Sequence, residues 1–130
     1  MPLLHSFVND HRVWVLNEAL ERYFAGIHEH FEQIPVDFGD ATPFQKLVWT
    51  AARATRWGTI STYGDLARSI GNPRAARAVG NALAANPLPI IVPCHRFLRT
   101  DGTLGGFSAG TDWKQELLKV ENIAPPVEIA

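Results

Sequence analysis

The cysteine at position 94, the only one in the chain, is followed directly by His95 and Arg96, and this triplet is suited to covalent chemistry. A thiolate is a strong nucleophile, and an imidazole that titrates near neutral pH can take the proton of a thiol. The apolar residues 90–92 and Pro93 lead into Cys94, which indicates a nucleophile in a protected pocket. A buried structural cysteine that happens to precede a surface histidine is the alternative.

The segments on either side of this triplet are irregular. Three prolines, at positions 87, 89 and 93, precede the cysteine closely. Proline lacks an N–H donor and restricts the residue before it, so residues 86–93 should be mostly extended. After the triplet, several glycines predict a turn-rich loop or small wing over residues 99–110. Asp112 should then cap a last helix.

Upstream, helix start and stop signals predict a helix-turn-helix. Thr42, Pro43 and Gln45 form a helix start with a capping box, and this helix should run to about residue 56. A second helix should begin at residue 61 or 62 and end at Gly71, and an Ala-rich third helix should run from Arg74 to about residue 85. Two short helices joined by a Gly-containing turn are typical of DNA-binding units.

The first forty residues predict one further helix and an extended segment. Asn9 or Asp10 could cap the helix and Gly26 could end it, whereas Pro35 excludes a central strand within residues 27–38. The predicted fold is therefore mainly α with minor β. It is a winged helix-turn-helix three-helix bundle with a short N-terminal helix, an extended segment and a C-terminal helix.

Length and composition limit the classes of protein. The chain has 130 residues, 46% of them hydrophobic and 19% charged, which fits one globular domain and excludes a disordered chain. We find no signal peptide and no stretch that is long and apolar enough to span a membrane. One cysteine cannot form an internal disulfide, so we expect a reducing, cytoplasmic setting.

Charge is unevenly distributed, although the formal net charge is only −1. Residues 42–99 hold eight basic residues against one acidic residue, which gives +7, whereas residues 1–41 carry −5 and residues 100–130 carry −3. A basic centre between acidic ends indicates a face for a polyanion. Internal ion pairing between the regions is the alternative.

A helix-turn-helix followed closely by a candidate nucleophile resembles the DNA-binding and active-site domain of the O6-alkylguanine-DNA alkyltransferases. The resemblance covers about residues 35–121 and rests on several strings in the family's order. These strings are Thr42-Pro43-Phe44-Gln45, Val48-Trp49, Ser61-Thr62-Tyr63-Gly64-Asp65-Leu66-Ala67, Arg74-Ala75-Ala76-Arg77-Ala78-Val79-Gly80-Asn81-Ala82, Asn86-Pro87-Leu88-Pro89-Ile90-Ile91-Val92-Pro93-Cys94-His95-Arg96, Gly105-Gly106-Phe107-Ser108 and Trp113-Lys114.

The resemblance implies repair of double-stranded DNA that carries O6-alkylguanine and, by extension, O4-alkylthymine. The damaged base would be flipped out, and its alkyl group would pass irreversibly to Cys94, so that each monomer acts once and uses no cofactor. This displacement needs a thiolate. His95 would take the thiol proton, directly or through water, and Glu121 would orient the imidazole. Tyr63 would donate its phenolic proton to the departing guanine.

The resemblance also assigns residues to the DNA and to the base. Arg77 would fill the gap left by the flipped base, and a phosphate contact is the alternative for this arginine. Small alanines would let the recognition helix enter the minor groove. The other expected DNA contacts are Arg74, Ala75, Ala78, Thr62 and Arg96. The expected residues of the substrate pocket are Phe97, Ser108, Phe107, Asn86 and Pro89.

The chain departs from the family in three places. Phe107 stands where the family often has Tyr, and Trp57 belongs to a string that we interpret as surface variation. Full-length relatives usually carry an N-terminal α/β domain, of which residues 1–40 would keep the final helix and strand. Some relatives bind zinc in that domain, but His28 and His30 have no cysteine nearby, so we expect no metal. The alkyltransferase domain would span residues 41–123, before a flexible tail of residues 124–130.

Three other functions stay open at this point. A non-catalytic lesion binder would resemble the alkyltransferase-like proteins, which replace the acceptor cysteine, and Cys94 argues against it. A helix-turn-helix regulator would hold the cysteine by chance and would recognise a specific operator. A Cys-His hydrolase would need an oxyanion hole and repeated turnover, and no motif calls for either.

Overall fold

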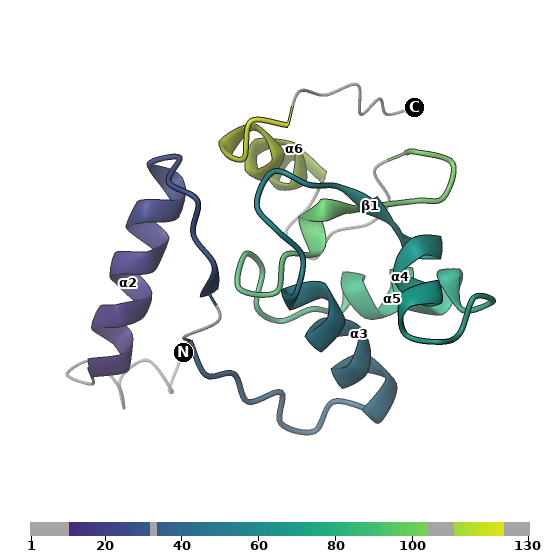
Figure 1. The fold of residues 1–130 in the computed structure, drawn as a ribbon. Coiled ribbons are helices and arrows are strands. Elements are labelled where there is room, and N and C mark those ends of the chain that lie inside the picture. The colour runs from purple at the N-terminus through teal and green to yellow at the C-terminus, as the bar shows by residue number, and fades with distance from the viewer. Residues whose placement is uncertain (1–10, 32–33, 104–110, 124–130) are drawn as a thin grey trace.

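The computed structural model describes residues 11–31, 34–103 and 111–123. Five α-helices and a two-stranded sheet within these ranges confirm the mainly α fold with minor β structure (Figure 1). The helices are α2 (His11–Phe24), α3 (Pro43–Arg53), α4 (Tyr63–Ser69), α5 (Ala76–Ala84) and α6 (Thr111–Val120). The 3-10 turn η2 (Cys94–Arg96) and the strands β1 (Ser61–Thr62) and β2 (Phe97–Leu98) complete the set.

Helix α3 starts as the sequence predicts. The Thr42 hydroxyl accepts a hydrogen bond from the Gln45 backbone N–H at 3.1 Å, and the Gln45 side chain accepts one from the Thr42 N–H at 3.0 Å. Pro43 occupies the first turn, where its missing N–H costs nothing. The helix ends at Arg53, earlier than expected, and its buried face carries Trp49.

Helices α4 and α5 form the predicted helix-turn-helix, and both pack against α3. Thr62 caps α4 by accepting a hydrogen bond from the Asp65 N–H at 3.0 Å. Gly71, with φ of +84°, ends it. The N–H groups of Gly71 and Asn72 return to carbonyls inside the helix at 3.0 and 2.9 Å, which is a Schellman end. Helix α5 begins at Ala76, so the expectation of a start at Arg74 is wrong.

The sheet is a short parallel pair in which Ser61 lies opposite Phe97 and Thr62 opposite Leu98. The sheet joins the start of α4 to the segment that follows η2, so it fixes the position of the helix-turn-helix relative to the cysteine. The predicted wing is described only as far as Thr103, where a turn closes with a 2.8 Å hydrogen bond from the Arg99 N–H. Residues 104–110 lie outside the described ranges. Helix α6 begins at Thr111, so Asp112 is not its cap.

The N-terminal segment packs on the same core as the helix-turn-helix. Ala19 and Tyr23 of α2, with Phe31 and Ile34 after it, belong to one hydrophobic cluster with Trp49 of α3. In Figure 1, α2 stands beside the body of the molecule, with the extended segment running back along it. The predicted helix caps at residues 9 and 10 and the predicted tail lie outside the described ranges. The division of the chain at residues 40 and 123 stays a prediction.

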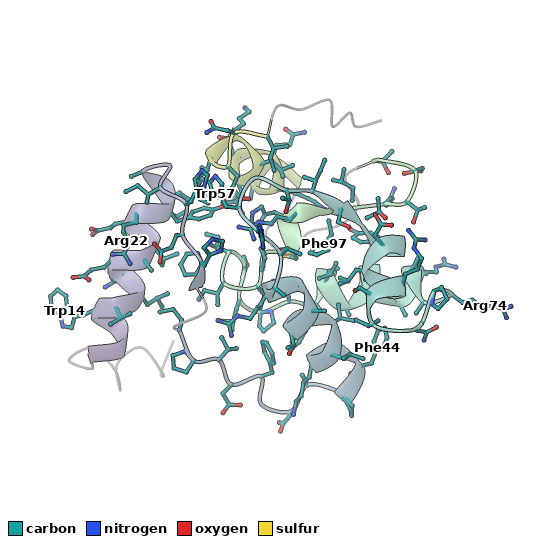
Figure 2. All side chains as sticks on the ribbon, viewed as in Figure 1. Trp14, Arg22, Phe44, Trp57, Arg74 and Phe97 are labelled. Carbon is teal, nitrogen blue, oxygen red and sulfur yellow. The ribbon has the colours of Figure 1, made fainter. Side chains whose placement is uncertain are left out.

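Trp57 corrects one interpretation of the sequence. Its side chain is only 7% exposed, so it is not surface variation. Its ring meets Tyr23 edge-on at 5.0 Å and stacks on His28 at 5.0 Å (centroid distances). Figure 2 shows it near α6 and the upper end of α2. An aromatic side chain at this place buries a large apolar area between segments that are far apart in the sequence. None of the described helices has the length and apolar character needed to cross a bilayer.

Candidate active site

Cys94 lies at the start of η2 and is 2% exposed. The segment before it is folded rather than extended. The Val92 N–H donates to the Leu88 carbonyl at 2.9 Å, and Ile90 adopts a φ of +77°, which is rare for a β-branched residue. Pro93, with φ −79° and ψ 63°, forms an inverse γ-turn that the Cys94 N–H closes on Val92 at 2.8 Å. Proline fixes the required φ, so this turn presents the thiol to the interior.

Asn86 braces this loop and also contacts the sulfur. Its side-chain oxygen accepts the Leu88 N–H at 2.9 Å, and its amide nitrogen donates to the Val92 carbonyl at 2.9 Å. The same nitrogen lies 3.2 Å from Cys94 Sγ as a donor. The side chain is 1% exposed, so these bonds form in a medium of low dielectric constant. Asn86 therefore links the end of α5 to the thiol.

A charged network lies beside the cysteine, with Glu121 at its centre. The carboxylate accepts hydrogen bonds from His95 Nε2 at 2.5 Å, from Tyr23 Oη at 2.8 Å and from the Gly58 N–H at 3.1 Å. Arg96 donates to it from Nε at 2.8 Å and from Nη2 at 3.1 Å. Burial alone would raise the pKa of Glu121, but the hydrogen bonds from His95 and Arg96 outweigh burial and lower the pKa to about 2. The group is a carboxylate at neutral pH.

His95 is 0% exposed and directs Nε2 at this carboxylate. Its Nδ1 is buried and makes no hydrogen bond with the described protein atoms. Burial lowers the pKa of His95, and the hydrogen bond with Glu121 opposes this only in part. The imidazole is therefore neutral near pH 7 and can accept a proton. The geometry agrees with the expected pairing of His95 and Glu121. It also leaves Nδ1, the second ring nitrogen, without a hydrogen-bond partner among the described residues.

The thiol of Cys94 is a weak acid in its buried environment. Burial raises the pKa of Cys94 to about 11, although the Asn86 amide and the Lys114 charge pull it down. A cysteine in a dry site loses more hydration of its anion than these groups replace. The thiol is thus protonated at neutral pH, and it would have to lose its proton before it could act as a nucleophile.

This state of the thiol gives a direct prediction. The ultraviolet absorbance of the thiolate, taken as the difference between the protein and a Cys94→Ser variant, should rise with a midpoint near pH 11. The variant has no thiol and supplies the tyrosine background. A midpoint below about 8.5, the value for a free cysteine, would contradict the burial argument.

Tyr63 and Lys114 both interact electrostatically with Cys94. The Tyr63 ring lies against α5 at Gly80, where an added Cβ would come within 3.0 Å of the ring. Its hydroxyl is buried and has no hydrogen-bond partner among the described residues, and burial raises its pKa. Lys114 is 0% exposed, with Nζ 5.7 Å from the centre of that ring. Burial lowers the pKa of Lys114 to about 8, opposed by Cys94. An O–H donor and a basic side chain thus lie near the thiol of Cys94.

The surface next to Tyr63 is hollowed. The hollow has a volume of about 530 Å³ and is bordered by Tyr63, Ala76, Arg77, Gly80, Asn81, Ala84, Arg99 and Thr100. Arg77 and Ala78 are exposed on α5, and Arg74 is exposed just before it; Figure 2 shows Arg74 pointing away from the body of the molecule. The outer side of the recognition helix therefore carries positive charge and small side chains beside the hollow.

Three residues expected to contact DNA make contacts within the protein. The Arg96 guanidinium is 4% exposed and bonds to Glu121 and to the Thr55 carbonyl, the latter at 2.9 Å, so it is an interior group. Ala75, the residue just before α5, is 8% exposed and belongs to the hydrophobic core. The Thr62 hydroxyl caps α4. Arg96, although it lies next to the cysteine in the sequence, therefore binds the Glu121 carboxylate and not a DNA phosphate.

The expected pocket residues are partly described. Phe97 is buried at 1% exposure in β2, and Pro89 is half-buried in the turn before the cysteine. Phe107 and Ser108 lie outside the described residues. No group of three or more His, Cys, Asp or Glu side chains gathers to hold a metal in the described part of the chain.

Sequence reasoning missed Tyr23 and gave Lys114 no role. For Lys114 a signal existed, because Lys114, Leu117, Leu118 and Glu121 repeat at the spacing of one helix face. Two charged residues on a face that also carries buried leucines indicate a buried polar site. For Tyr23 no signal existed, because its partner is 98 positions away.

Comparison with known proteins agrees with this geometry. The family model described as the 6-O-methylguanine DNA methyltransferase, DNA binding domain, matches residues 43–123. A methylated-DNA–protein-cysteine methyltransferase of Haemophilus influenzae is 50% identical over 105 residues, which are 81% of this chain and 58% of that protein. The chain thus spans little more than half of that relative.

Solved structures give the same result. A crystal structure of Mycobacterium tuberculosis O6-methylguanine methyltransferase matches with a TM-score of 0.75 and 41% identity, over 85% of this chain and 66% of that one. A structure of Mycobacterium tuberculosis OGT in complex with DNA matches with a TM-score of 0.73 and 40% identity, over 86% of this chain and 68% of that one.

Proposed function

Because the chain belongs to the 6-O-methylguanine DNA methyltransferase family, we propose that it repairs DNA by moving the alkyl group of O6-alkylguanine onto Cys94. The transfer is irreversible, so that each molecule acts once, as a monomer, and consumes no cofactor. Its partner is double-stranded DNA that carries the damaged base. The observation that carries the proposal is a buried thiol that the Asn86 amide contacts and that is followed directly by the His95 of the His95–Glu121 pair, in the segment after a helix-turn-helix.

The proton of the thiol is the first requirement of the reaction. His95 is neutral, and its Nδ1, which has no hydrogen-bond partner among the described residues, accepts the proton from Sγ through a bridging water. The Glu121 carboxylate, bonded to Nε2, stabilises the imidazolium that results. The Lys114 ammonium and the Asn86 amide stabilise the thiolate as it forms. The nucleophile is therefore generated at the moment of use.

The alkyl group is then transferred by nucleophilic displacement at its carbon atom. A lone pair of Sγ forms the S–C bond while the bond between that carbon and guanine O6 breaks, and its electron pair stays on the base. The Tyr63 hydroxyl, buried and without a partner among the described residues, donates a proton to the departing guanine. The proton held by His95 restores the tyrosine through solvent, so the net change moves the thiol proton to guanine.

The recognition helix supplies the approach to DNA. Alkylated O6 is enclosed by the stacked bases of a duplex, so the nucleotide must rotate out before Sγ can reach it. Exposed Arg77 on α5 fills the gap in the stack, and Arg74 contacts phosphate. The exposed Ala78 lets the helix come close to the narrow minor groove. Alkylation damage arises in any base sequence. The minor groove displays little sequence information, so binding there suits a protein that must search DNA of any sequence.

The stoichiometry of repair tests this function. The protein is mixed with an excess of duplex DNA that holds a single O6-methylguanine, and restored guanine is scored by cleavage with a restriction enzyme that the lesion blocks. Restoration should stop at one guanine per protein molecule. Binding without restoration would establish a lesion-binding protein instead, and restoration that continues beyond one per molecule would establish a turning-over enzyme.

The unpaired thiol also favours a reducing compartment, and we place the protein in the cytoplasm.

A further inference from the structure

Tyr23 reaches the centre of the charged network from outside the region that the family model matches. It lies in α2, whereas the match covers residues 43–123. Its hydroxyl donates to Glu121 Oε2 at 2.8 Å and lies 3.3 Å from His95 Nε2. The same carboxylate oxygen accepts from His95 Nε2 at 2.5 Å. Groups from α2 and η2 therefore meet at one oxygen atom of Glu121, the residue that follows α6.

The position of the Tyr23 hydroxyl is fixed by packing. The side chain is 0% exposed, and its ring contacts Trp57 edge-on at 5.0 Å and Phe31 at 5.9 Å between centroids. Burial raises the pKa of Tyr23, and the Glu121 charge raises it further, so the phenol keeps its hydrogen. A phenol has a single hydrogen to donate, and the short contact to Oε2 takes it.

That bond constrains the imidazole. Because Tyr23 points its hydrogen at Oε2 and its lone pairs toward His95, the nitrogen Nε2 must carry a hydrogen of its own to satisfy both neighbours. The lone pair of the neutral ring then resides on Nδ1, which is the buried nitrogen without a hydrogen-bond partner among the described residues. The orientation of one phenol thus fixes which nitrogen can act as a base.

We infer that Tyr23 is a positioning residue of the reaction, which holds Glu121 and sets the tautomer of His95. This inference rests on the proposed function. The N-terminal segment then supplies part of the catalytic machinery, and the matched domain by itself lacks one donor of the network. The charged or titratable groups that face the His95–Glu121 pair are Tyr23 from α2, Arg96 from η2 and Lys114 from α6.

A Tyr23→Phe variant tests the inference, since it keeps the ring and removes the hydroxyl. With free O6-benzylguanine as the substrate, which needs no DNA binding, the rate of alkyl transfer should fall about tenfold, because fewer molecules then hold the lone pair of the neutral His95 ring on Nδ1. A tenfold loss is the size expected for a hydrogen bond to a charged group. The acid limb of the pH–rate profile should also move to higher pH. Without the phenol the carboxylate is a stronger acceptor, so the Glu121–His95 pair takes up a proton more readily.

A packing control separates this effect from loosened structure. Phe31→Leu removes a ring that contacts Tyr23 but leaves the hydroxyl, so it should lower the melting temperature and leave the pH–rate profile in place. In a Glu121→Gln background, Tyr23→Phe should slow transfer no further. A full tenfold loss in that background would overturn the claim that the phenol acts through the carboxylate.

The outcomes distinguish the inference from the proposed function. If the unaltered protein fails to take the benzyl group, the proposed function is wrong, whatever Tyr23 does. If the unaltered protein reacts and Tyr23→Phe reacts at the same rate with the same pH–rate profile, the inference is wrong and the function stands. If Tyr23→Phe is slower but its acid limb has not moved, the hydroxyl does not act through the Glu121–His95 pair, and the inference is again wrong.

Discussion

Replacing Glu121 with glutamine is expected to slow alkyl transfer by about 10²–10⁴-fold, the range for loss of acid–base assistance. Glutamine fills the same space but carries no charge, so it cannot stabilise an imidazolium at His95. The variant should also lose about 3–5 kcal/mol of unfolding free energy, because the buried Arg96 guanidinium would lack its counter-charge. Single-turnover kinetics with O6-benzylguanine and urea denaturation measure the two effects.

A double variant separates catalysis from stability. Arg96→Met together with Glu121→Gln removes both charges, and neutral replacements of a buried ion pair are often harmless to folding. This protein should regain most of the stability that Glu121→Gln removes and stay as slow as Glu121→Gln alone. If the double variant recovered the rate as well, the role of Glu121 would be structural and the assignment to His95 would fail.

The same carboxylate makes the fold sensitive to acid. The pKa of Glu121 is about 2 in the folded chain, below the unfolded value of about 4.3, and that of His95 is lowered below about 6.5. A group whose pKa is depressed by folding stabilises the fold above its unfolded pKa, and the contribution disappears as pH falls. The free energy of unfolding should therefore decline from about pH 6.5 downward. In Glu121→Gln, the further decline below about pH 4.3 that protonation of Glu121 causes should be absent.

Replacing Arg77 with alanine is expected to slow repair of duplex DNA by about 30- to 100-fold, because an extruded base leaves a gap whose cost is a few kcal/mol. Reaction with free O6-benzylguanine should change by less than about twofold, since Arg77 is exposed on α5, on the outer side of the recognition helix. Rates on the two substrates, measured side by side, give the comparison.

Arg74→Ala is the matched control. It removes an equally exposed arginine just before the same helix. If Arg74 binds a phosphate, its removal should lower the slope of log K against log salt by about 0.9. If Arg77→Ala only reproduced that change in slope, and slowed duplex and free-base reactions equally, then Arg77 would bind phosphate and would not be the residue that fills the gap.

Local signals in the sequence predict the helix-turn-helix well. The capping box at Thr42 and the helix end at Gly71 each depend on residues a few positions apart, and both occur as expected. The predicted start of α5 is too early because an alanine-rich string carries no cap that marks its first turn. The approach to Cys94 is folded where an extended segment is predicted, because proline excludes a helix but does not exclude a γ-turn.

Long-range contacts decide what the sequence could not predict. The electrostatic state of Cys94 depends on how completely it is buried, which the neighbouring residues in the sequence do not reveal. Arg96 is expected on DNA because it is a cation beside the cysteine, yet its partner Glu121 comes from the end of α6. Trp57 and Tyr23 meet across more than thirty positions and close the site from the N-terminal side. Each of these contacts exists only once the helices have packed.

The site of the transferred methyl group tests the central claim most directly. After reaction with an excess of duplex DNA that carries O6-methylguanine, peptide mass mapping should place a single added methyl group on Cys94. A Cys94→Ala variant should gain no mass and still bind the duplex. Methyl transfer to the Cys94→Ala variant, or restored guanine without a methylated Cys94, would contradict the account.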